Sequence, residues 1–108
     1  MPTYNKLVRD LIPQIIEKSG KQYTTTILDN KEYITALQAK LHEELQEYLE
    51  AKNDQDATEE LADILELIYA LTKVHGSTPE NLEKIRSQKA AKRGGFNDKI
   101  FLIEVEDE

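Results

Sequence analysis

The sequence predicts an all-α protein, a bundle of about four helices with one small pair of β-strands. Two long stretches with helical spacing of apolar residues carry this prediction, at about 30–51 and 56–75. The polar turn between them, Lys52 to Gln55, is so short that the two helices must return antiparallel. At 108 residues we expect one domain over 1–108, with a core so modest that oligomerisation would help to stabilise it.

The shorter elements follow from end signals in the sequence. A first helix is predicted from about Asp10, with Pro13 in its first turn, to Ser19-Gly20. Asp29 or Asn30 is the candidate cap of the first long helix. A fourth helix is predicted from Thr78-Pro79, capped by Ser77 or Thr78, to Gly94-Gly95.

Two β-branched and apolar runs predict the strand pair. Residues 22–28 lie in the run KQYTTTIL, and residues 99–105 form KIFLIEV. We expect these two strands to pair with each other.

Composition excludes several classes of protein. The chain has no cysteine, which excludes disulfides and thiolate chemistry and fits a reducing cytoplasm. Its net charge of −7 disfavours a nucleic acid polymer as partner. No apolar run reaches the roughly 18 residues of a membrane span, and no targeting segment is visible. We therefore expect a cytoplasmic protein without a membrane partner.

Helix geometry separates the acids of the two long helices into two groups, because each residue turns the helix by about 100°. Glu44 continues the apolar row of the first helix, and Glu47 flanks that row. Glu60 falls inside the apolar arc of the second helix, and Asp63 lies at its margin. Four neighbouring acids point to solvent on the same count: Glu43, Glu50, Glu59 and Glu66.

A carboxylate at a core position costs roughly several kcal/mol unless it is protonated, paired with a cation or bound to a metal. Counting from the turn, Glu47 and Glu60 are predicted at one height, and Glu44 and Asp63 in the next layer. Such a cluster could hold one or two hard cations, Mg²⁺ or possibly Mn²⁺, because no Cys or His cluster favours zinc. Equally, Glu44 and Glu60 could lie at a wet bundle edge and pair with Lys40, Lys92 or Arg93.

Basic residues near the ends of the chain are candidate phosphate ligands. Lys92 and Arg93, in the run KAAKRGGF, could hold a substrate's phosphates, or could simply complement the dipole of the fourth helix. Lys6 and Arg9 could serve the same purpose, or form exposed ion pairs. The two histidines have no partner at ligand spacing, and we assign them to structure or surface.

Three motifs in this order resemble the all-α nucleoside triphosphate pyrophosphatase superfamily, which contains MazG, dimeric dUTPases and phosphoribosyl-ATP pyrophosphohydrolase. They are Glu44-x-x-Glu47 followed after twelve residues by Glu60-x-x-Asp63, the run KLVRDLIPQII at 6–16, and KRGGF at 92–96. The first and last runs are similar to the small MazG-like branch described as house-cleaning enzymes.

The resemblance implies a Mg²⁺-dependent enzyme that cleaves a nucleoside triphosphate between its α and β phosphates, releasing a monophosphate and pyrophosphate. It makes Glu44, Glu47, Glu60 and Asp63 the metal ligands, one of which could activate water, and it implies a homodimer or higher homo-oligomer. The KLVRD-type N-terminus and KRGGF argue against phosphoribosyl-ATP pyrophosphohydrolase of histidine biosynthesis, the alternative enzyme. A non-catalytic helical dimerisation module is the alternative from another class.

Overall fold

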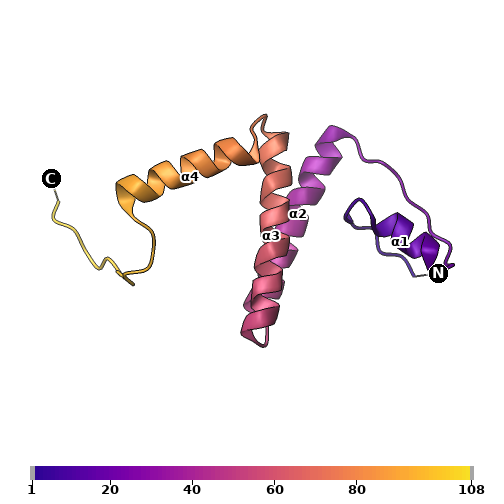
Figure 1. Cartoon of the computed structure of the whole chain (residues 1–108), viewed down its shortest axis with the longest axis horizontal. Helices are drawn as coiled ribbons and strands as arrows, with labels where there is room; N and C mark the ends of the chain where they lie inside the picture. The colour runs from indigo at the N-terminus through magenta and orange to yellow at the C-terminus, as the bar shows by residue number, and fades with distance from the viewer. Residues whose placement is uncertain (1, 108) are drawn as a thin grey trace.

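A computed structural model describes residues 2–107 of the chain and shows four helices over them (Figure 1). The two long helices, α2 (Asn30–Leu49) and α3 (Asp54–Val74), form the antiparallel hairpin at the centre of the molecule. The shorter helices, α1 (Ile12–Lys18) and α4 (Pro79–Arg93), lie on opposite sides of that hairpin. The prediction of an all-α protein is therefore confirmed.

Side-chain caps decide where the hairpin helices begin. Asp29 caps α2 through a capping box, in which its Oδ1 accepts from the N–H of Glu32 at 2.8 Å. Asn53 caps α3 by accepting from the N–H of Asp56 at 2.8 Å, so α3 begins two residues earlier than predicted. With α2 ending at Leu49, the hairpin turn is shifted toward the N-terminus by about two residues.

The ends of α4 confirm their sequence signals. Thr78 caps α4 by accepting from the N–H of Asn81 at 3.0 Å, and Gly94 ends it with a φ of 85°, a left-handed angle that favours glycine. Helix α4 contacts α3 near their shared corner and then projects away from the hairpin (Figure 1). In α1, Leu11 rather than Asp10 is the capping position, and it makes no side-chain cap.

The predicted strand pair is wrong for the described residues, because neither 22–28 nor 99–105 forms a strand. The two segments lie on opposite sides of the hairpin (Figure 1), so their backbone N–H and C=O groups cannot form hydrogen bonds with each other. Their β-branched and aromatic residues fit a pleated, half-buried surface, and strand propensity alone does not supply one. Ile27, Phe101 and Ile103 are almost fully exposed instead.

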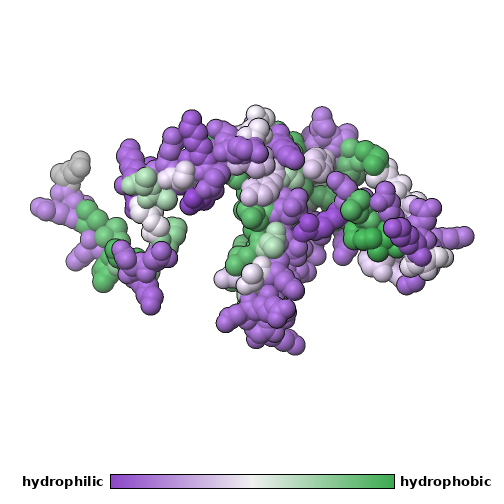
Figure 2. Space-filling model, viewed as in Figure 1, coloured by the Kyte–Doolittle hydropathy of each residue, from purple (hydrophilic) through white to green (hydrophobic). Residues whose placement is uncertain are grey.

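The core of the described chain is small. Leu37 of α2 and Leu67 of α3 are its buried hydrophobic residues, at 2% and 8% exposure. Apolar groups instead lie on the surface of the hairpin and along the C-terminal segment, as Figure 2 shows. None of the described helices is long and apolar enough to cross a membrane.

Candidate metal centre

Glu44 and Glu60 replace one apolar layer between the hairpin helices. Glu44 lies seven residues after Leu37 on α2, and Glu60 lies seven residues before Leu67 on α3. Seven residues are about two helical turns, so each acid occupies the stripe that buries its leucine. Glu44 and Glu60 lie close together, and the same seven-residue spacing on both antiparallel helices places Leu37 and Leu67 at one level, two turns farther from the hairpin turn.

This register differs from the predicted layering. Glu44 stands five residues before the end of α2, and Glu60 stands six residues after the start of α3, so these two share a level. Oxygens of Glu44, Glu60 and Asp63 lie within 4.8 Å of one another, as do those of Glu43, Glu44 and Glu47. Glu44 therefore joins both groups, and Glu47 lies one turn nearer the connector.

Burial follows the division predicted from helix geometry for every acid except Glu47. Glu44 is only 7% exposed, Glu60 and Asp63 are half-buried, and Glu47 is exposed at the rim. All four acids predicted to face solvent do so: Glu43, Glu50, Glu59 and Glu66.

Two carboxylate oxygens in this cluster lack a hydrogen-bond partner. They are Oε2 of Glu44 and Oε2 of Glu60, both buried. An unpaired buried polar atom costs about 1–3 kcal/mol, and more when it is charged. The free oxygens therefore fit a hard divalent cation, which prefers carboxylate ligands.

The pKa of Glu44 is raised to about 7, first by burial and then by the neighbouring carboxyl groups of Glu60, Glu47 and Asp63. Near neutral pH this site can accordingly take up either a proton or a cation. A bound cation would favour the ionised carboxylate and so oppose both causes of the shift.

Two cations of the chain already contact the cluster. Lys40, one turn before Glu44 on α2, places its Nζ 3.8 Å from Glu44 Oε1, which confirms the partner considered for a wet bundle edge. Arg9 places Nη2 2.7 Å from Asp63 Oδ1. Neither cation reaches the two unpaired oxygens.

The remaining candidate phosphate ligands lie away from these acids. Lys92 and Arg93 are exposed in the last turn of α4. About 16 Å of α3 separates Asp63 from the corner, and α4 then continues for about 21 Å in another direction. Lys6 places its Nζ 5.8 Å from the centroid of the Tyr4 ring. The structure thus brings Arg9 alone of these four to the acids, and the phosphate-binding roles stay predictions.

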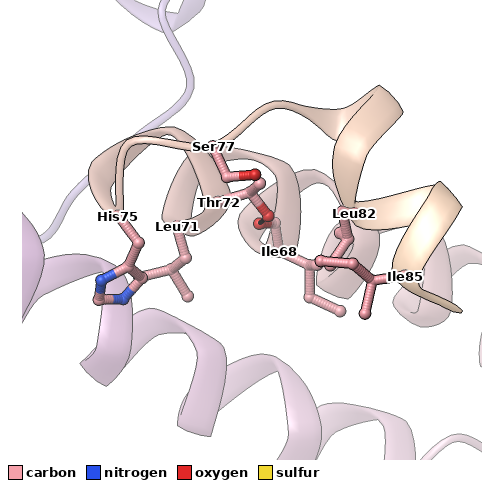
Figure 3. A pocket seen from close by; sticks show the side chains of 7 residues that line it. All are labelled: Ile68, Leu71, Thr72, His75, Ser77, Leu82 and Ile85. Atoms are coloured by element: carbon pink, nitrogen blue, oxygen red, sulfur yellow. Dashed lines mark hydrogen bonds between the residues drawn. The ribbon is translucent and has the colours of Figure 1, made fainter.

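A separate, open pocket lies at the corner between α3 and α4 (Figure 3). It has a volume of about 360 Å³ and no acidic lining residue, so it is distinct from the carboxylate cluster. Its lining is mostly apolar: Ile68, Leu71, Thr72, His75, Ser77, Leu82 and Ile85.

Comparison with known protein families gives a match. Residues 4–89 match the family model described as phosphoribosyl-ATP pyrophosphohydrolase, which covers most of the chain and all four clustered acids. The KRGGF run lies beyond the matched residues. Searches of curated proteins and of solved structures gave no match.

Proposed function

The chain belongs to the phosphoribosyl-ATP pyrophosphohydrolase family of the MazG-like helical superfamily, and we propose that it is a Mg²⁺-dependent nucleoside triphosphate pyrophosphohydrolase. The observation that carries the proposal is the acidic layer in the hairpin, where Glu44 faces Glu60 and each has a buried oxygen without a partner. Two such buried groups destabilise a purely structural module, whereas a bound cation would offset this cost.

Glu44, Glu60 and Asp63 would hold the cation, with Glu47 at the open rim as a fourth ligand. Mg²⁺, or Mn²⁺ in its place, would supply charge neutralisation of the polyphosphate and activation of the attacking water. The half-buried position of Asp63 and the exposure of Glu47 leave one side of the cluster open to a ligand. One carboxylate there can take the proton of the water that attacks phosphorus.

For the substrate we propose non-standard or surplus nucleoside triphosphates, cleaved between the α and β phosphates to a monophosphate and pyrophosphate. The KLVRD and KRGGF runs support this house-cleaning role. The matched family favours phosphoribosyl-ATP as the second candidate. Both substrates present a triphosphate to the same carboxylates, so the site chemistry is common to them.

The test measures pyrophosphate release from standard nucleotides, modified nucleotides and phosphoribosyl-ATP, with Mg²⁺ and with EDTA. Wild type should turn over at least one of them only with the metal. Glu60→Gln should lose at least about 100-fold in kcat/KM, because it removes a buried ligand. Glu59→Gln, the same change on the exposed face, is the matched control and should stay within about twofold.

Metal-dependent turnover of none of these nucleotides would contradict the enzyme proposal. Mn²⁺ binding separates the two hypotheses independently of activity. If the chain is a non-catalytic dimerisation module, Glu60→Gln should bind Mn²⁺ with the affinity of wild type; if Glu60 is a metal ligand, the variant should bind Mn²⁺ more weakly. We further propose that the protein is cytoplasmic. We also propose that it works as a homodimer or higher homo-oligomer, because the described chain has a small core and many exposed apolar residues.

A further inference from the structure

One ion pair joins the N-terminal segment to the acidic cluster. The guanidinium Nη2 of Arg9 donates to Oδ1 of Asp63 at 2.7 Å, across 54 positions of the chain. The two side chains are 54% and 42% exposed, so water and ions reach the contact. Arg9 therefore neutralises a proposed metal ligand without closing the site.

Among the described residues, the Arg9–Asp63 pair is the only side-chain hydrogen bond or ion pair between residues 2–28 and the hairpin. Helix α1 packs against none of the other described helices. The carbonyl of Arg9 accepts a hydrogen bond from the N–H of Ile12 at 3.1 Å, and its guanidinium makes no described hydrogen bond other than the one to Asp63. Lys40 differs, because it is fixed on α2 and its side chain is only 20% exposed. Of the two cations at the cluster, Arg9 is the more exposed.

We propose that Arg9 is an exchangeable counter-ion of the site: it holds Asp63 in the metal-free protein, yields that carboxylate to the divalent cation, and then binds the phosphates of the substrate. This inference rests on the proposed function and adds a defined role for the KLVRD segment.

The relative strengths of the interactions favour the exchange. An exposed ion pair changes an equilibrium constant by about fivefold at most, whereas a divalent cation in a carboxylate cluster interacts with several charges at once. Once displaced, the guanidinium retains a planar fork of N–H donors that matches phosphate oxygens.

Three arginines in the sequence make the exchange directly observable by NMR, since each gives one Nε–H signal. Arg86 is the internal control, because it pairs with Glu83 within α4 at 2.6 Å. The Arg9 signal should move when wild type is titrated with Mg²⁺, and should move again when a non-hydrolysable nucleoside triphosphate is added. The Arg86 signal should stay in place during the Mg²⁺ titration.

Binding measurements on variants show whether Arg9 competes with the metal or helps to bind it. Arg9→Ala should bind Mn²⁺ about two- to fivefold more tightly than wild type, because a competing cation is gone. The same variant should bind the non-hydrolysable triphosphate, at saturating Mg²⁺, at least about fivefold more weakly. Arg86→Ala should change neither affinity, and Arg9→Lys should fall between wild type and Arg9→Ala.

An Arg9 signal that ignores Mg²⁺ would overturn the proposal. Weaker Mn²⁺ binding by Arg9→Ala would overturn it too, because Arg9 would then orient Asp63 for the metal rather than compete with it. Failure of the proposed function looks different: wild type would hydrolyse no nucleotide while its Arg9 signal still moved with Mg²⁺. That result would support the displacement of Arg9 by Mg²⁺ and contradict the proposed pyrophosphohydrolase activity.

Discussion

Glu44 occupies a position at which its own helix predicts a leucine. It belongs to the buried stripe of α2, its exposure is 7%, and its pKa rises to about 7 because it is buried among other carboxyl groups. A raised pKa means that the folded protein holds this proton more tightly than the unfolded chain. Stability from this group is therefore complete below pH 4.5, the ordinary value, and is lost as the pH rises through about 7.

We predict that the metal-free protein loses free energy of unfolding between pH 5 and pH 8 relative to Glu44→Gln. The loss should be about 1–3 kcal/mol, since each unit of pKa shift corresponds to about 1.4 kcal/mol. Urea denaturation in EDTA at several pH values, at one protein concentration, measures it. Glu43→Gln, an exposed neighbour, should retain the wild-type dependence. If the wild-type and Glu44→Gln curves run parallel, the proton on Glu44 does not control stability.

Saturating Mn²⁺ should reverse this dependence, because the metal favours the ionised carboxylate. We predict that wild-type Mn²⁺ affinity increases about tenfold per pH unit below pH 7 and levels off above it, as the competing proton leaves Glu44. Calorimetric titration at pH 5.5, 6.5 and 7.5 measures this. An affinity that does not change over this range would show that Glu44 is not a ligand.

The two hairpin helices show how far the sequence alone leads. Their existence, their antiparallel order and the inward positions of Glu44, Glu60 and Asp63 follow from apolar spacing, because each long helix must bury one stripe. The layer pairing did not follow, since Asn53 begins α3 two residues earlier than the apolar pattern indicates, which brings Glu44 opposite Glu60. The Arg9–Asp63 contact was not predicted either, because no local spacing connects residues 54 positions apart.

The role of α4 is open to a direct test. We predict that Lys92→Ala with Arg93→Ala lowers kcat/KM by more than about twofold if these side chains reach the substrate's phosphates in the assembled enzyme. The matched control is Lys84→Ala with Arg86→Ala, which removes two charges from the middle of the same helix. Steady-state pyrophosphate release measures both. A loss within about twofold, or roughly 0.5 kcal/mol, would leave the pair with only a helix-capping role.

At the scale of the whole molecule, the hairpin has one apolar side without cover. Turning about 100° per residue from the line where the helices meet places Leu41 and Leu45 of α2 and Leu61 and Leu65 of α3 on the same side. Three of these leucines are 46–49% exposed. The described chain extends over 63 Å in its longest direction around a core of two buried leucines. Such a surface is typical of a subunit interface.

We predict that this side of the hairpin forms the homodimer, so that two hairpins pack as a four-helix bundle. Leu65→Glu should convert the dimer to a monomer, because it would bury an unpaired charge in an interface. Sedimentation velocity at micromolar concentration measures the change. Gln46→Glu adds the same charge to an exposed polar position on α2 and should leave the dimer intact. A wild-type monomer, or a Leu65→Glu variant that remains dimeric, would place the contact between subunits elsewhere. In that case the exposed residues of the C-terminal segment, led by Phe101 and Ile103, are the next apolar surface to substitute.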